Sequence, residues 1–308
     1  MDKYLAGLFS DSSRESIKSF IRSAQISVNG KMILKPSAVL KNGDLISGTV
    51  NDQIDKVKLM PENIKLDILF ENNDVVVINK PAGMVVHPGD ANEAGTLANA
   101  LIYHYPKIVY AIADRGEDRL KNLRPGIVHR LDKDTSGVMI VAKHKKSYEY
   151  LVEQFKKRNI IKKYLAVCLG FLKNDSGTIE SVIGRKPSNR KMMGEVGDGA
   201  GKKAITVYKV LQSYNHRDTQ FSLLEFEIKT GRTHQIRVHA KESGFPILGD
   251  KVYFIKESKA TSHKLNVDRQ LLHSHSLSLA LPDESMASIF KAPLAKDMAM
   301  IINLISGN

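Results

Sequence analysis

The segment 124–137, RPGIVHRLDKDTSG, places two carboxylates among cations and turn-forming residues, and apolar runs flank it. Lys133 directly follows Asp132, Arg130 lies two residues before it, and Asp134 lies two residues after it. Neighbouring cations favour the ionised form of a carboxylate, which can act as a nucleophile, a base or an electrostatic stabiliser. An aspartate here can equally close a turn or cap a helix. Asp132 and Asp134 are therefore the first candidates for chemistry.

A second polar segment, 229–239, reads KTGRTHQIRVH and follows an alternating apolar stretch over 221–228. If this segment is a strand, Gln235 and Arg237 share one face, because side chains alternate between the two faces of a strand. They could then converge on a ligand or a carboxylate. The alternative is a basic edge of a sheet.

The histidines His129, His234, His239, His273 and His275 do not have the spacing of a known zinc site. The single cysteine, Cys168, lies in the apolar run 166–169, which predicts a packed thiol rather than a nucleophile or a ligand. Glycine-rich phosphate loops and the G-x-S-x-G element are absent from the sequence. We expect neither a metal nor a nucleotide cofactor.

The chain of 308 residues has 46 Lys and Arg against 33 Asp and Glu, a formal net charge of +13. This excess favours a polyanionic partner, either nucleic acid or an anionic membrane surface, although it can also serve solubility alone. No apolar run approaches the ~20 residues that a membrane-spanning helix needs, and residues 1–16 lack a signal peptide's apolar region. We expect a cytoplasmic protein that binds nucleic acid and no membrane.

The pattern over residues 61–308 predicts one domain in which strands outnumber helices. Strands are expected over 64–70, 75–78, 138–142, 221–228 and 271–281, and helices from Thr96 and over 146–157 and 297–305. The strands and helices do not alternate regularly, which favours an α+β fold with a mostly antiparallel mixed sheet. The basic segments 143–163 and 185–191 could follow an RNA backbone or lie on a solvated surface, the second as an exposed loop.

Residues 1–60 predict a small α/β domain. A capping box at Ser12 opens a helix that ends near Ala24, and Arg14, Lys18 and Arg22 form a basic ridge along it. An Asn-Gly turn at 29–30 lies between short apolar runs, and a second lies at 42–43. The arginine-bearing helix and the VNGK turn resemble the S-four type of RNA-binding module, named after a ribosomal protein. The resemblance implies RNA contacts by Arg14, Lys18, Arg22, Asn29 and Lys31. The polar, proline-containing stretch 51–63 predicts a linker.

Over nearly the whole chain, the sequence resembles the pseudouridine synthases of ribosomal and transfer RNA. The longest shared motif is GIVHRLDKDTSG at 126–137, and the segments 79–89, 161–164, 230–239 and 269–273 also match. The resemblance implies isomerisation of a uridine in structured RNA without a cofactor. The N-terminal module is similar to that of synthases acting on large-subunit (23S) ribosomal RNA. The partner would be that RNA or an assembling ribosomal particle, and nothing in the sequence requires a dimer, so we expect a monomer.

The resemblance also assigns roles to residues of this chain. Asp132 would be the catalytic carboxylate, Arg130 would occupy the space left by the flipped uridine, and Tyr164 would lie beneath the base. Arg237 would pair with Asp132, with Arg232 as the competing partner. His129 and Ile236 would also contact the substrate.

Three alternatives remain at this point. A non-catalytic RNA-binding protein of ribosome assembly would need the basic surface but not the combination of Asp132, Tyr164 and Arg237. A synthase could act on transfer RNA instead of ribosomal RNA. A glycosidic-bond hydrolase would need two carboxylates, and Asp134 is the second acid in the signature.

Overall fold

The computed structural model describes residues 1–9, 17–18, 21–22, 26–48, 59–89, 92–111, 124–186, 189–284 and 286–307. Contacts divide the chain into two compact units, one within residues 1–58 and the other beginning at Leu59. Each unit is described by itself. That the first is a separate RNA-binding domain stays a prediction, and most of the predicted linker lies outside the described residues.

The first unit combines helix α1 (Asp2–Leu8) with a small antiparallel sheet of β1 (Ile26–Val28), β2 (Lys31–Met32) and β3 (Ile46–Gly48) in the order β2-β1-β3. Val28 pairs with Lys31, so Asn29 and Gly30 form a two-residue hairpin turn. Both have positive φ, 51° and 77°, which is the conformation that Asn-Gly favours in such turns. The predicted turn at 29–30 is confirmed.

The side chain of Asn29 joins this turn to the second one. Its Nδ2 donates to Oδ1 of Asp44 at 2.8 Å, and its Oδ1 accepts from the backbone N–H of Leu45 at 2.9 Å. Hydrogen bonds from the Lys41 backbone and from Asn29 lower the pKa of Asp44. Asn29, predicted to contact RNA, therefore has a structural function in holding the two turns together.

Only four residues of the predicted helix 12–24 are described. Residues 17–18 and 21–22 are helical, and Ile17 and Ile21 are buried against Leu5 and Ile26. Arg22 and Lys31 are exposed. Arg14 lies outside the described residues.

In the part of the second unit that the structure describes, ten strands form one sheet, nine of them in the order β4-β5-β6-β12-β7-β11-β10-β8-β9, with β13 paired to β12. All pairs are antiparallel except β6 with β12. The α+β prediction is confirmed. The strands are β4 (Ile68–Glu71), β5 (Val75–Lys80), β6 (Ser136–Ala142), β7 (Ile161–Leu169), β8 (Ser176–Lys186), β9 (Asn189–Glu195), β10 (Lys202–His216), β11 (Thr219–Ile228), β12 (Leu272–Ala280) and β13 (Ala287–Lys291).

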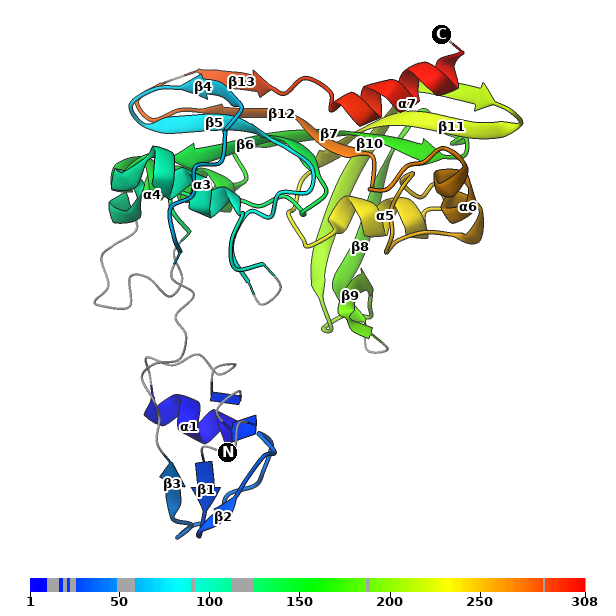
Figure 1. Cartoon of the computed structure of the whole chain (residues 1–308). Helices are drawn as coiled ribbons and strands as arrows, with labels where there is room; N and C mark the ends of the chain where they lie inside the picture. The colour runs from blue at the N-terminus through cyan, green and yellow to red at the C-terminus, as the bar shows by residue number, and fades with distance from the viewer. Residues whose placement is uncertain are drawn as a thin grey trace. The chain divides into compact units, whose positions relative to one another are not determined.

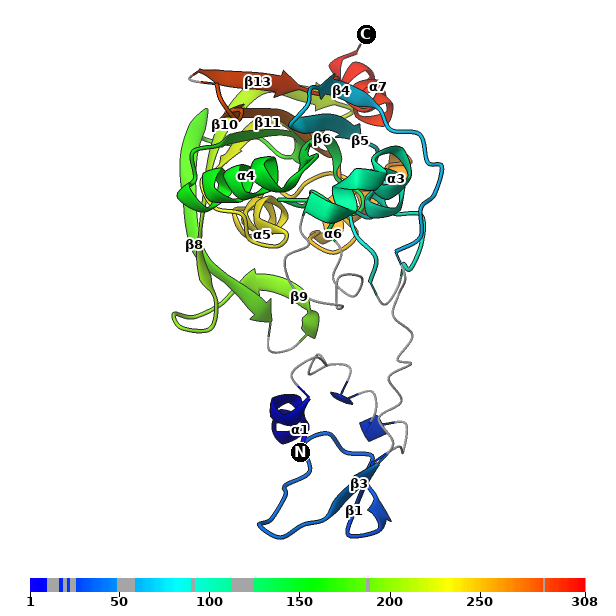
Figure 2. The ribbon, with the colours of Figure 1, turned by 90° about the vertical axis from the view of Figure 1, so that its left-hand side faces the viewer.

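Helices cover both faces of this sheet. In Figures 1 and 2, α3, α4, α5 and α6 lie on one face and the C-terminal α7 lies on the other. Thr96 caps α3 as predicted, accepting a hydrogen bond from the backbone of Asn99. The helices are α3 (Leu97–His104), the 3-10 helix η1 (Pro106–Ala111), α4 (Lys145–Lys157), α5 (Gln235–Glu242), α6 (Lys256–Lys264) and α7 (Lys296–Ser306).

The strand β6 lies at the centre of the core, and all of its residues are buried. It directly follows the segment that carries Asp132. Gly137 has φ +113°, and a Cβ atom there would lie 2.2 Å from the carbonyl oxygen of Ser274 on β12. Only glycine permits this close approach. Cys168 on β7 is fully buried, as predicted, and burial raises the pKa of its thiol.

The structure corrects three interpretations of the sequence. The polar segment after β11, considered above as a possible strand, is not one: His234 turns the chain at φ 57°, and α5 begins at Gln235. The segment 185–191 is not a loop, because its described residues belong to the hairpin strands β8 and β9. The strand expected over 64–70 begins only at Ile68, where pairing with β5 starts.

Candidate active site

A cavity of about 500 Å³ opens beside the centre of the sheet in the second unit. Its walls come from the segment before β6, the end of α4, strand β7 and the connection from β11 to α5. The residues predicted here for catalysis or substrate binding all line it: His129, Arg130, Asp132, Tyr164, Arg232, Ile236 and Arg237. Residues far apart in the sequence thus meet at one site.

Asp132 is paired with Arg237. Nη1 of Arg237 donates to Oδ2 of Asp132 at 3.0 Å, and the carboxylate remains 25% exposed, whereas the arginine side chain is 6% exposed. Arg232 instead donates through Nε to the carbonyl oxygen of Lys203, 3.0 Å away. The choice between the two arginines is therefore settled in favour of Arg237.

Asp250 holds Arg237 from the buried side. Nε and Nη2 of Arg237 donate to Oδ2 and Oδ1 of Asp250 at 2.7 and 2.9 Å, and the Asp250 side chain is fully buried. Burial disfavours the charge on Arg237, but the hydrogen bonds and charges of the two aspartates outweigh it and raise the pKa of the guanidinium. Arg237 is a permanent cation with a fixed orientation towards Asp132.

The position of Asp250 depends on the glycine before it. Gly249 has φ +82°, and a Cβ atom there would lie 1.9 Å from the carbonyl oxygen of Arg269. The backbone N–H groups of Val252 and Tyr253 donate to Oδ1 of Asp250. Sequence analysis missed Asp250, because a Gly-Asp pair is typical of any surface turn and only the fold brings it to Arg237.

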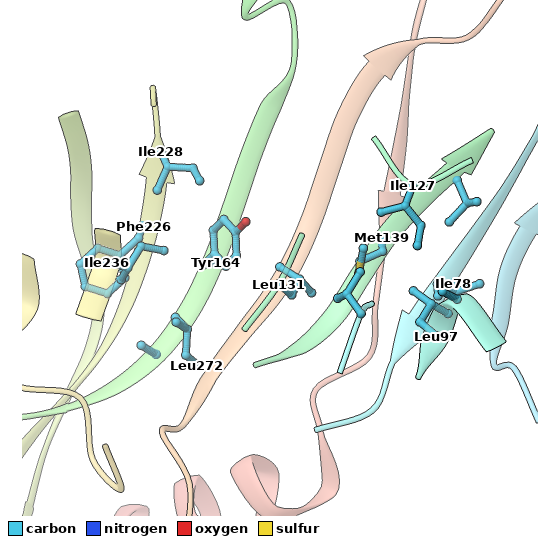
Figure 3. Packing of buried hydrophobic residues seen from close by; sticks show 14 of the residues in the cluster. Ile78, Leu97, Ile127, Leu131, Met139, Tyr164, Phe226, Ile228, Ile236 and Leu272 are labelled. Atoms are coloured by element: carbon cyan, nitrogen blue, oxygen red, sulfur yellow. The ribbon is translucent and has the colours of Figure 1, made fainter. Parts of the chain in front are cut away.

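Tyr164 on β7 forms part of the apolar wall. Figure 3 shows its ring beside Leu131, Leu272 and Ile236, which belong to the same buried cluster. Burial raises the pKa of Tyr164 to about 12, against a hydrogen bond with Ser274 that lowers it. The phenol is therefore protonated at neutral pH. A flat apolar surface of this kind can stack on a nucleobase.

Basic side chains surround the cavity. Arg130 is exposed at its mouth. Lys162 lies with Nζ 5.8 Å from the ring centre of Phe155, and burial lowers the pKa of its amine. Lys156, Arg158, Lys229 and Arg232 complete the cationic lining. Such a rim can receive the phosphates of a nucleic acid.

The ring of His129 is held by contacts within the protein. Its Nε2 accepts a hydrogen bond from the backbone N–H of Ile140 at 3.0 Å, and its ring stacks on Phe155 with centroids 4.8 Å apart. Burial lowers the pKa of His129 to about 3. The imidazole is neutral, and one of its nitrogens is already used by the protein.

Lys80 and Arg269 hold the segment that carries Asp132. The buried Nζ of Lys80 donates to the carbonyl oxygens of Pro81, Met84 and Lys133 at 2.8, 2.9 and 3.0 Å. Burial lowers the pKa of Lys80 to about 7. Nη1 of Arg269 donates to the carbonyl oxygen of Asp134 at 3.0 Å. The backbone on the C-terminal side of Asp132 is thus fixed at two successive residues.

Among the described residues, no group of three or more His, Cys, Asp or Glu side chains could hold a metal ion. No described helix is long and apolar enough to cross a membrane.

The sequence matches the family model described as RNA pseudouridylate synthase over residues 74–242, which include Asp132, Tyr164 and Arg237. A Bacillus subtilis (strain 168) protein named as an RNA pseudouridine synthase is 37% identical over 308 residues, 100% of this chain and 94% of that one. The ribosomal large subunit pseudouridine synthase D of Escherichia coli (strain K12) is 36% identical over 313 residues, 99% of this chain and 90% of that one.

Two solved structures have the same fold. Human RNA pseudouridylate synthase domain containing 1 has a TM-score of 0.58 at 23% identity, covering 80% of this chain and 97% of that one. Human RNA pseudouridylate synthase domain containing 4 has a TM-score of 0.57 at 25% identity, covering 78% of this chain and 92% of that one. By its sequence and its fold, the chain belongs to the RNA pseudouridylate synthase family and is an isomerase that acts on RNA.

Proposed function

We propose that this enzyme isomerises specific uridines of large-subunit ribosomal RNA and that Asp132 is its catalytic carboxylate. The observation that carries the proposal is the array Asp132–Arg237–Asp250, which presents one partly exposed carboxylate at the wall of a basic cavity. The enzyme would work as a monomer in the cytoplasm, without a cofactor, on ribosomal RNA or on an assembling ribosomal particle.

The chemistry explains why an ionised carboxylate is needed. Cleavage of the bond between N1 of uracil and C1′ of the ribose develops positive character on the sugar. Asp132 can stabilise that charge, attack C1′, or remove a sugar proton. The uracil then rotates and bonds to C1′ through carbon 5, carbon 5 loses its proton, and N1 ends protonated. No atom is gained or lost, and Arg237 keeps the carboxylate of Asp132 oriented throughout.

Other residues around the cavity would bind the extrahelical nucleotide. Unstacking a base costs a few kcal/mol, and Arg130 at the mouth of the cavity could fill the vacated space. Tyr164 and Ile236 would contact the uracil, and Arg232 would contact phosphate. For His129 we propose an indirect role, because its ring is committed to Ile140 and Phe155.

The choice of ribosomal RNA rests on relatives that match nearly the full chain, such as the large subunit pseudouridine synthases D of Yersinia pestis and Escherichia coli. The first unit supports it, since its tight Asn29-Gly30 turn and exposed Arg22 and Lys31 suit an S-four-type module that binds structured RNA. Lys18 would extend this surface.

A matched pair of variants tests the catalytic assignment. Wild type, Asp132→Asn and Asp134→Asn are incubated with unmodified large-subunit ribosomal RNA and, separately, with transfer RNA, and pseudouridine is mapped by chemical labelling and primer extension. We expect site-specific product in ribosomal RNA from wild type and Asp134→Asn and none from Asp132→Asn. Product confined to transfer RNA would overturn the substrate, and an active Asp132→Asn would overturn the catalytic role.

Free uracil is measured in the same reactions. A hydrolase would release the base and would need both acids of the signature. Retained base together with an active Asp134→Asn excludes that chemistry.

A further inference from the structure

The two oxygens of Asp132 face different partners. Oδ2 accepts from Arg237 at 3.0 Å, and Oδ1 faces Nε2 of His234 at 3.7 Å. His234 lies on the connection from β11 to α5, lines the cavity and is 24% exposed. Catalytic hydrogen bonds are often long without substrate and shorten in the complex. His234 is therefore placed to act on the oxygen that Arg237 leaves free.

The hydroxyl of Tyr253 is the partner of Nδ1 of His234. The hydroxyl of Tyr253 accepts from the backbone N–H of Met193 at 3.0 Å and lies 2.9 Å from Nδ1 of His234. When this hydroxyl donates its own proton to Nδ1, the proton of the neutral imidazole lies on Nε2, towards Asp132.

Burial favours the neutral imidazole of His234. Burial lowers the pKa of His234, the carboxylates of Asp132 and Asp250 raise it, and the guanidinium groups of Arg237 and Arg130 lower it. The net direction is downward. A neutral ring with its proton on Nε2 can donate to Asp132 without neutralising the carboxylate.

The backbone is adapted to this contact. His234 adopts a left-handed conformation, φ 57° and ψ 21°, at the residue that caps α5. A side chain other than glycine in this region carries strain, which tends to occur at functional sites. The ring meets Tyr253 edge to face at 5.5 Å, and Tyr253 is 3% exposed with its ring 5.0 Å from the guanidinium carbon of Arg237. Tyr253 thus supports both partners of Asp132.

We propose that His234 is a positioning residue for Asp132 and that Tyr253 fixes the required tautomer, linking strand β9 through Met193 to the catalytic carboxylate. This rests on the proposed catalytic role of Asp132. When RNA fills the cavity, Nε2–H of His234 closes on Oδ1, so that both oxygens are held while the glycosidic bond breaks.

The tautomer is measured first, because that readout needs no activity. Protein with ¹⁵N-labelled histidine is examined by long-range ¹H–¹⁵N correlation at neutral pH, with His234→Gln used to assign the signal. We expect His234 with its proton on Nε2 in wild type and a mixture of tautomers in Tyr253→Phe, which keeps the ring but loses the hydroxyl. A proton on Nδ1, or a charged ring, in wild type would overturn the proposal.

A second pair of variants tests the donor. His234→Gln keeps an N–H group near the position of Nε2, and His234→Met has a similar size but no donor. In single-turnover reactions at saturating RNA, we expect His234→Met to slow the chemical step by about tenfold or more relative to wild type. His234→Gln should retain most of the wild-type rate, and both variants should bind RNA with unchanged affinity. Equal losses in the two variants, or a loss confined to affinity, would refute the positioning role.

The pH profile provides a third readout. Without the Tyr253 hydroxyl, the lone pair of Nδ1 is left without its donor and takes up a proton more readily, so the rate of Tyr253→Phe should fall at a higher pH than the rate of wild type does. Tyr150→Phe is the matched control, since it removes a hydroxyl that bonds to Ala280 outside the cavity. If Asp132→Asn is active and His234 has the expected tautomer, the proposed catalytic role of Asp132 is wrong. If Asp132→Asn is inactive and His234 of wild type has the other tautomer, only the proposed role of His234 is wrong.

Discussion

Arg237 is bound more extensively to Asp250, which is fully buried, than to Asp132, which faces the cavity. The guanidinium of Arg237 therefore connects the buried ion pair with Asp250 to the ion pair with the proposed catalytic Asp132. Removing a single partner of a buried pair leaves an uncompensated charge, whereas removing both charges can cost little. Variants of Arg237 and Asp250 can therefore separate the effect of this array on stability from its effect on catalysis.

We expect Arg237→Met to lower the free energy of unfolding by roughly 3–5 kcal/mol, because the Asp250 charge is left unpaired. The double variant Arg237→Met/Asp250→Asn should recover much of this loss, since the Asn oxygen still accepts from Val252 and Tyr253. Urea unfolding measures the effect. Pseudouridine formation should stay low in both, as neither retains the cation beside Asp132; a double variant with wild-type activity would contradict that role.

Tyr164 should act through its ring rather than through its hydroxyl. A pKa of about 12 keeps the phenol protonated, so it is no base at neutral pH. We expect Tyr164→Phe to retain most of the single-turnover rate. Tyr164→Leu should lose roughly 1–3 kcal/mol of base stacking, about 5- to 150-fold in RNA binding or rate. If Tyr164→Phe loses as much activity as Tyr164→Leu, the hydroxyl takes part in proton transfer instead.

Local signals in the sequence predicted Asp132 as a candidate and the strand behind it, whereas the roles of Tyr164 and Arg237 were predicted from the family resemblance. The signature around Asp132 contains turn residues that no core strand would tolerate, and the apolar run at 138–142 after it predicts the central strand β6. Both signals come from residues adjacent in the sequence, so they can be recognised without the fold.

Helix α5 could not be predicted for a physical reason. An amphipathic helix is recognised by apolar residues every three or four positions, but α5 is buried on nearly all sides. Its apolar Ile236, Val238 and Ala240 alternate with polar residues that are equally buried, because Arg237 is paired with Asp250 and His239 is bonded to Thr206 and Ser181. The alternation of apolar and polar residues along α5 is therefore the pattern expected of a strand.

His129 should make stability sensitive to acid. Its pKa is about 3 in the folded protein and near 6.5 in an unfolded chain, so between these values only the unfolded chain takes up the proton. This contribution to stability is complete above pH 6.5 and is lost as the pH falls towards 3. We expect His129→Gln to reduce the pH slope of the unfolding free energy by up to about 1.4 kcal/mol per pH unit in that window. The exposed His263→Gln is the control. Parallel slopes for wild type and His129→Gln would show that the ring titrates normally.

The first unit should contribute to RNA binding mainly through charge. Arg22 and Lys31 are exposed and are not needed for the Asn29 hydrogen bonds that hold the turns, so replacing both with Gln should leave the unit folded. Each lost phosphate contact lowers the dependence of log affinity on log salt by about 0.7–0.9. We therefore expect Arg22→Gln/Lys31→Gln to weaken binding to ribosomal RNA at low salt and to reduce that slope by up to about 1.4–1.8. Lys296→Gln, an exposed change on α7 on the sheet face away from α3–α6, should alter neither quantity. If the double variant binds with the affinity and salt slope of wild type, the basic surface of the first unit does not contact the RNA.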